Sequence, residues 1–244
     1  MNYWFYILLI LFPLSGGIIG YYTKFTKKNN LKILLAFAGS YLLSIVLFHL
    51  IPHLYNEIHV WSGVFLLSGF FFQIFIERYS QGVEHGHMHL HVNEQGQAKK
   101  FIPYQILISL SLHSFMEGMP LGSDFLATDK SKLSFLFGIV LHELPAAFAM
   151  VSILKASHIK SKLILTFIAI YACMSSLGAA SSQLINGMLD EKVFEYLMAF
   201  VVGTFLHIAT TILFENSENH RFTWNKVAAM VSGILLALLV SAGS

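Results

Sequence analysis

The sequence predicts an all-α protein: a polytopic membrane helix bundle of eight transmembrane helices that forms one domain over residues 1–244. Hydrophobic residues make up 56% of the chain and charged residues only 11%, so most of it would expose large apolar surfaces in water. A helix needs roughly 20 apolar residues to span a bilayer, and the chain offers eight such runs between polar breaks.

The eight apolar runs are expected to form the helices in chain order. Glycine and proline within them are ordinary for membrane interiors. The first run has no basic region before it and no small-residue cleavage site after it, which favours a retained helix over a removed signal peptide. The expected spans are approximately 2–23, 31–52, 60–79, 101–123, 132–155, 161–185, 193–215 and 225–243.

Lysine and arginine predict the orientation. Twelve of the fifteen lie in or beside the first, third, fifth and seventh connections, and the even connections hold only Lys130, Lys132 and Lys192. The positive-inside rule therefore places the odd connections in the cytoplasm and both termini outside. We expect a multi-pass protein of the cell membrane, the inner membrane if the chain is bacterial. The net charge of +2 gives no indication of nucleic-acid binding.

The longest polar break, residues 80–100, is expected to be a flexible, His-rich cytoplasmic loop within the domain. Histidine stands at every second position from His85 to His91, a pattern that either binds metal weakly or is simply solvated. Cys173 is the single cysteine, which rules out an intrachain disulfide and a Cys-rich metal cage. Any metal must therefore use imidazole, carboxylate or other oxygen ligands.

Two neighbouring runs carry such groups at membrane depth. His113 and Glu117 in the fourth run are four residues apart and share one helix face, and His142 and Glu143 follow each other in the fifth run. A charged side chain at the centre of a membrane helix costs about 3 kcal/mol on insertion scales. One shared divalent cation would compensate these groups, and imidazole ligands favour zinc over magnesium or calcium. All four residues are therefore predicted metal ligands.

Other interpretations of the intramembrane polar residues stay open. The same four side chains could form a metal-free hydrogen-bond network with protonated glutamates, although four costly groups exceed what helix packing requires. His49 and His53, at the end of the second run, either collect metal at the outer surface or anchor in the membrane interface. His207 is an isolated intramembrane histidine with either a pathway role or a structural one.

The stretches His113–Gly118 (His-Ser-Phe-Met-Glu-Gly) and His142–Pro145 (His-Glu-Leu-Pro), supported by His49–His53 and Gly203–Ala209, give the chain a specific likeness. Over its whole length it resembles the ZIP (Zrt/Irt-like protein) family of divalent metal transporters. The resemblance implies a ZIP-like fold and transport of a divalent transition metal, zinc first, into the cytoplasm, without enzymatic activity. It also implies a homodimer in many cases, and a bundle of the first, fourth, fifth and sixth helices that slides against the other four.

By this resemblance, the family's main metal site corresponds to three of the predicted ligands: His113, Glu117 and His142. Glu143 corresponds to an adjacent second site. The chain departs from the family at Ser114, Ala146 and Ser175, where relatives commonly have asparagine, a further ligand and, in some cases, a carboxylate. We therefore expect one well-formed transport site and not a two-metal cluster.

Two alternatives to transport remain. His142-Glu143 opens like the zinc-protease pattern in which two histidines bind zinc and a glutamate activates water. Ala146 stands where the second histidine is required, so an intramembrane zinc-dependent hydrolase has little support. A metal sensor that uses the loop histidines without transport is the other alternative. Nothing in the sequence selects the preferred metal, because affinity orders leave that choice to geometry and availability.

Overall fold

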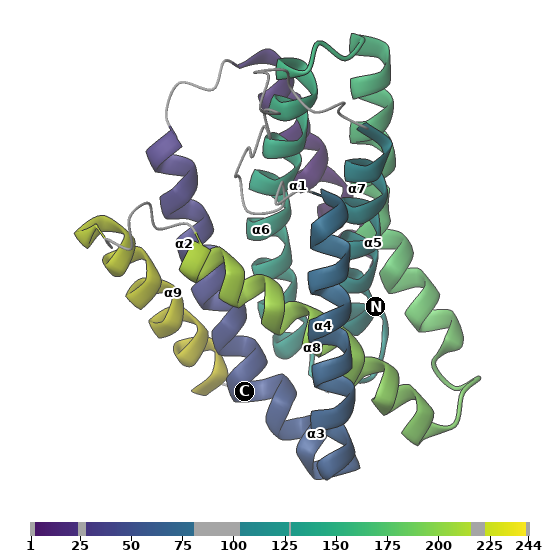
Figure 1. The fold of residues 1–244 in the computed structure, drawn as a ribbon. Coiled ribbons are helices and arrows are strands. Elements are labelled where there is room, and N and C mark those ends of the chain that lie inside the picture. Colours follow the sequence, from purple (N-terminus) through teal and green to yellow (C-terminus); the bar gives the residue numbers. More distant parts are fainter. Residues whose placement is uncertain (1–2, 24–27, 81–102, 127, 216–222, 243–244) are drawn as a thin grey trace.

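The computed structural model describes residues 3–23, 28–80, 103–126, 128–215 and 223–242, and within these residues it contains helices and no strand. The predicted all-α fold is therefore confirmed (Figure 1). The predicted loop with His85–His91 lies outside the described residues. The helices are α1 (Tyr3–Tyr22), α2 (Lys28–Ile45), η1 (Val46–Leu50), α3 (Ile51–Ile58), α4 (Val60–Ser80), α5 (Pro103–Gly122), α6 (Asp129–Ala156), α7 (Ser161–Ile185), α8 (Glu191–Glu215) and α9 (Trp224–Ala242).

The helices match the predicted spans, with α2, η1 and α3 together forming the second one. Within the described residues, six segments are long and apolar enough to cross a membrane: Tyr3–Tyr22, Lys32–Ile58, Val60–Arg78, Asp129–Ala156, Ser161–Ile185 and Glu191–Leu213. The apolar part of α9, Trp224–Val240, is shorter. Helix α5 has 20 residues, as many as α1, but buried polar side chains such as His113 and Glu117 make it less apolar. Neighbouring helices cover this polar face, so α5 need not meet lipid there.

Helices α1, α5, α6 and α7 form one closely packed group, in which α5 pairs with α7 and α1 with α6. A Cβ added at Gly118 or Gly122 of α5 would overlap the backbone of α7, and one at Gly178 of α7 would overlap the Phe115 carbonyl. On α1, a Cβ at Gly16 would overlap the Leu144 carbonyl of α6. Small residues thus bring these helix backbones into direct contact, as is common between membrane helices.

The second group contains α2, α3, α4, α8 and α9, with α4 paired against α8 and α2 against α9. Glycine again permits the closest approaches: Gly69 faces the Phe200 carbonyl, Gly203 faces the Leu66 carbonyl, and Gly233 of α9 faces the backbone of α2. In Figure 1, α9 lies beside α2 at the outer edge of the bundle. Each group therefore has backbone-level contacts of its own.

Side chains of α2 contact α6 at the boundary between the two groups. Helix α2 meets α6 where Gly138 faces the side chains of Leu42 and Tyr41. The Tyr41 hydroxyl lies 2.8 Å from the Ser134 hydroxyl across the same contact. Helices α4 and α8 both contact α5, which places α5 at the boundary between the groups.

Candidate metal site

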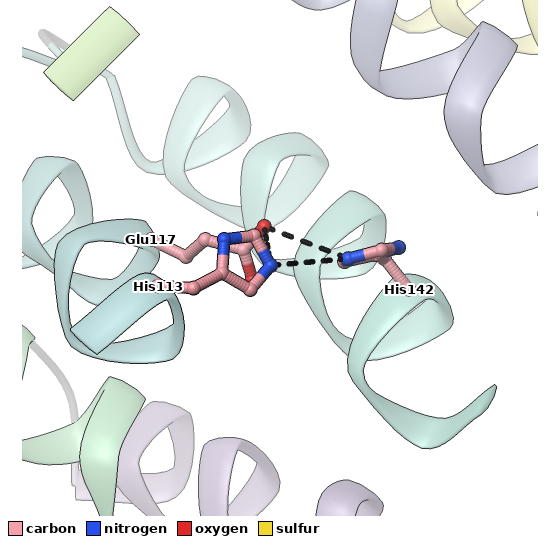
Figure 2. A group of neighbouring side chains, drawn as sticks. All are labelled: His113, Glu117 and His142. Atoms are coloured by element: carbon pink, nitrogen blue, oxygen red, sulfur yellow. Dashed lines mark hydrogen bonds and ion pairs between the residues drawn. The ribbon is translucent and has the colours of Figure 1, made fainter. Parts of the chain in front are cut away.

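Three predicted ligands meet between α5 and α6. His113 and Glu117 lie one turn apart on α5, and His142 projects toward them from the middle of α6 (Figure 2). The His113 Nε2 atom lies 3.3 Å from His142 Nε2 and 3.4 Å from Glu117 Oε1, and His142 Nε2 lies 3.9 Å from the same carboxylate oxygen. All three residues are fully buried. The arrangement thus directs two imidazole nitrogens and one carboxylate oxygen toward one another.

This spacing suits a zinc ion. Zinc binds histidine nitrogen and carboxylate oxygen at about 2.0–2.2 Å, so ligand atoms at the corners of a tetrahedron lie about 3.3–3.5 Å apart. Two of the three observed distances agree with this range, and the third is slightly longer. Three protein ligands also leave the fourth position for water, which is the coordination of exchangeable zinc sites rather than closed structural ones.

The metal-free alternative remains compatible with the same geometry. The two imidazole rings are nearly perpendicular, with centroids 5.5 Å apart. If one Nε2 carries hydrogen and the other does not, the 3.3 Å contact is a histidine–histidine hydrogen bond.

Glu143, the fourth predicted ligand, does not join this group. The Ser114 hydroxyl donates to its Oε1 atom at 2.6 Å, and the Ser175 hydroxyl donates to the same atom. Within the described residues, the His, Cys, Asp and Glu side chains whose ligand atoms gather within 4.8 Å are His113, Glu117 and His142. Successive helical residues point about 100° apart, so His142 and Glu143 face different neighbours.

Two serines are the hydrogen-bond partners of Glu143 Oε1, whereas its Oε2 atom is buried without a hydrogen-bond partner among the described residues. Ser114 and Ser175 lie 2.8 Å apart, and both are fully buried. They come from α5 and α7, so the carboxylate of α6 is tied to two other helices of its own group. Sequence reasoning noted both serines as departures from the family but missed that they hydrogen-bond Glu143.

The structure separates His49 from His53. The π-helical turn η1 contains His49 and ends at Leu50, so it changes the residue spacing between His49 and His53. His49 lines a small cavity with Lys130, Ser131 and Ser134, whereas His53 lies 3.8 Å from Glu195 of α8. The His53 ring also packs edge-on against Phe125. The two imidazoles therefore contact different residues, and they do not form one metal site together.

His207 has a partner that sequence reasoning missed. Its Nε2 atom lies 2.5 Å from Oε2 of Glu77, and the two residues are 130 positions apart in the chain. The only signal in the sequence was a carboxylate near the end of the third apolar run, where an interfacial position was equally reasonable. The pairing depends on how α4 packs against α8.

Comparison with known proteins gives a consistent result. A family model described as ZIP Zinc transporter matches residues 80–241. Zinc transporter ZIP9 of Micropogonias undulatus is 26% identical over 214 residues, which cover 78% of this chain and 67% of that protein. Zinc transporter ZIP9 of Xenopus tropicalis is 25% identical over 213 residues, covering 78% and 68%. Zinc transporter ZIP1 of Takifugu rubripes is 31% identical over 129 residues, covering 50% and 40%.

Proposed function

This chain belongs to the ZIP zinc transporter family and moves zinc or another divalent metal ion across a membrane, and we propose that the ion passes through the site formed by His113, Glu117 and His142. The family favours transport over the hydrolase and sensor alternatives. The single observation that carries the proposal is the convergence of three buried ligand atoms, from two helices, at distances that suit tetrahedral zinc.

The donor set suits a transported ion. Two neutral imidazoles and one carboxylate attract a divalent cation and offset what the bilayer would otherwise oppose. Three ligands and a water hold the ion less tightly than a closed four-ligand site, and conduction requires release as well as binding. Glu143 is the remaining predicted ligand, and its serine hydrogen bonds favour a supporting role on α6 over a second, separate metal. Metal analysis of purified protein at low zinc should then find one tightly bound ion per chain.

The packing supports relative movement of two rigid groups. Glycine contacts join the backbones within α1, α5, α6 and α7, and the same holds for the group built on α2, α4, α8 and α9. Where α2 meets α6, the contact between the groups is made by side chains of α2 such as Tyr41 and Leu42. Side chains can exchange partners during a sliding movement, whereas glycine-mediated backbone contacts cannot without separating the helices. We infer that α1, α5, α6 and α7 carry the ion together.

The orientation, the direction of transport and the assembly are predictions. The distribution of lysine and arginine favours cytoplasmic odd connections and external termini. Uptake toward the cytoplasm is what the family resemblance implies. The homodimer that the family resemblance implies stays a prediction, which the mass of the purified protein in detergent would test. The assignment of residues 1–244 to one membrane domain also stays a prediction.

Zinc uptake by reconstituted vesicles tests the proposed site. His113→Ala and His142→Ala should each abolish uptake at limiting zinc, because each removes a metal ligand. Losing even a residue that only hydrogen-bonds a ligand lowers metal affinity or activity by roughly 10–100-fold. His158→Asn, which changes an exposed imidazole between α6 and α7, is the control and should retain uptake. Normal uptake by either site variant would exclude this route for the ion.

Deleting residues 85–91 should change the affinity or regulation of uptake and leave the ability to transport. The loop histidines lie outside the apolar runs, whereas His113, Glu117 and His142 lie within them. Concentration-dependent uptake in the same vesicles measures this. If a well-expressed deletion shows no flux at any zinc concentration, the loop is part of the pathway and the prediction is wrong.

A further inference from the structure

The contact between Glu77 of α4 and His207 of α8 is a second pairing of metal-binding side chains inside the bundle. The Nε2 and Oε2 atoms are 2.5 Å apart, and the side chains are only 10% and 17% exposed. Phe70 covers the imidazole edge-on at 4.9 Å, and the Thr211 hydroxyl lies 3.4 Å from Nε2. An imidazole and a carboxylate are thus held together in a largely apolar setting.

Helix packing alone does not account for this pair. One turn from His207, Gly203 brings α8 against the Leu66 carbonyl of α4, and Gly69 brings α4 against the Phe200 carbonyl of α8. The aromatic rings of Phe65 and Tyr196 stack across the same two helices. The helices are therefore already joined by inexpensive contacts, whereas a carboxylate within a membrane helix carries a cost.

Glu77 and His207 lie toward the opposite end of the bundle from His53. His53 contacts Glu195 near the start of α8, and His207 follows twelve residues later, about 18 Å further along the helix. In Figure 1, α4 runs from α3 toward the side on which α5 begins, and Glu77 lies within the last turn of α4. The sequence predicts that this side is cytoplasmic.

The two helices of the pair also contact α5, which carries two residues of the site formed by His113, Glu117 and His142, here called the central site. Gln73, fully buried one turn before Glu77, adds an amide to the same face of α4. Gln73, Glu77 and His207 therefore place polar groups on α4 and α8 toward the predicted cytoplasmic end.

We propose that Glu77 and His207 form a receiving site for the transported divalent ion on the cytoplasmic side of the central site. The inference rests on the proposed function and adds a second station to the same pathway. One imidazole and one carboxylate, with the Thr211 hydroxyl nearby, bind a divalent cation more weakly than the three strong ligands of the central site. Weak binding suits an ion that must be released.

Zinc binding to a protein without the central site tests the proposal directly. The background carries His113→Ala, His142→Ala and four loop changes: His85→Ser, His87→Ser, His89→Ser and His91→Ser. Equilibrium dialysis against zinc should find one ion per chain, bound at least about tenfold more weakly than by unmodified protein. Adding Glu77→Gln or His207→Gln should abolish it, and Glu195→Gln, the same change at the outer contact, should not. Zinc binding that survives Glu77→Gln, or is lost with Glu195→Gln, overturns the proposal.

Transport kinetics separate a metal site from a simple tie between α4 and α8. In an otherwise unmodified chain, Glu77→Gln should lower the maximal rate about tenfold or more and leave the half-saturating zinc concentration unchanged. The double variant Glu77→Gln with His207→Gln offers an amide–amide hydrogen bond in place of the ion pair. It should regain thermal stability without regaining flux. Full flux in this variant means that the pair only joins two helices, and the proposal fails.

The two proposals fail in different ways. If vesicles that contain the unmodified protein take up no zinc, the proposed function fails, whatever the dialysis shows. If uptake depends on His113 and His142 but the dialysis background binds no zinc, the central site stands and the receiving site is excluded.

Discussion

Glu117→Gln should abolish zinc uptake and leave the protein folded. The carboxylate is fully buried beside two imidazoles, and it supplies the negative charge that attracts a divalent ion. The amide keeps the size of the side chain but is a poor zinc ligand. Uptake should fall by more than the roughly 10–100-fold loss of activity that follows removal of a residue that only hydrogen-bonds a metal ligand. A neutral side chain also lowers the cost of placing α5 in the bilayer, which is about 3 kcal/mol for a carboxylate at a helix centre.

Two measurements on the purified variant check this result. Vesicle uptake at limiting zinc measures transport, and thermal unfolding with and without zinc measures binding. Zinc at a hundred times its dissociation constant should stabilise the unmodified protein by about 2.7 kcal/mol and the variant hardly at all. Glu57→Gln, the same change at an exposed carboxylate of α3, is the control and should behave like the unmodified protein. A variant with unmodified uptake would show that Glu117 is not a ligand.

Gly122→Leu should prevent α5 and α7 from packing and so remove both folded protein and transport. Even a Cβ at this position would overlap the Ala179 carbonyl, and a backbone atom cannot move aside as a side chain can. Overpacking a core usually costs about 1–3 kcal/mol, and a whole isobutyl group against backbone should exceed that range. The loss extends to the metal site because α5 carries His113 and Glu117.

The amount of monodisperse protein after detergent extraction, and its unfolding temperature, measure this effect. Gly63→Ala on α4 is the matched control, because a Cβ there meets only the terminal hydroxyl of Tyr55. That variant should keep the yield, stability and uptake of the unmodified chain. If Gly122→Leu gives a stable, active protein, α5 and α7 are not held together at this contact.

Local rules were sufficient where the relevant interaction lies within one helix. Long apolar runs predicted the helices, and the four-residue spacing placed His113 and Glu117 on one face. The same spacing rule was insufficient for His49 and His53, because the π-helical turn before Pro52 changes the residue spacing there. Polar side chains at membrane depth are costly. Their presence in both of two neighbouring runs predicted that α5 and α6 would meet at His113, Glu117 and His142.

The partners of Glu143 and His207 required the packed structure. Glu143 follows His142 directly, yet the helical turn directs it to hydroxyls from α5 and α7. His207 meets Glu77 over a separation of 130 residues. Neither pairing has a periodic signature, because each depends on the rotation and depth of helices that are distant in the chain.

The sequence by itself determined that this chain lies in a membrane as a helical bundle, and that two of its helices carry zinc-type ligands. Length, hydropathy and helical period are properties of single segments, so they can be evaluated without knowing the neighbours. The tertiary structure decided which three side chains converge, which carboxylate is held by serines, and which histidine gains an acidic partner. These depend on distances of a few ångströms between helices, which glycine contacts and side-chain packing determine only once the whole bundle has assembled.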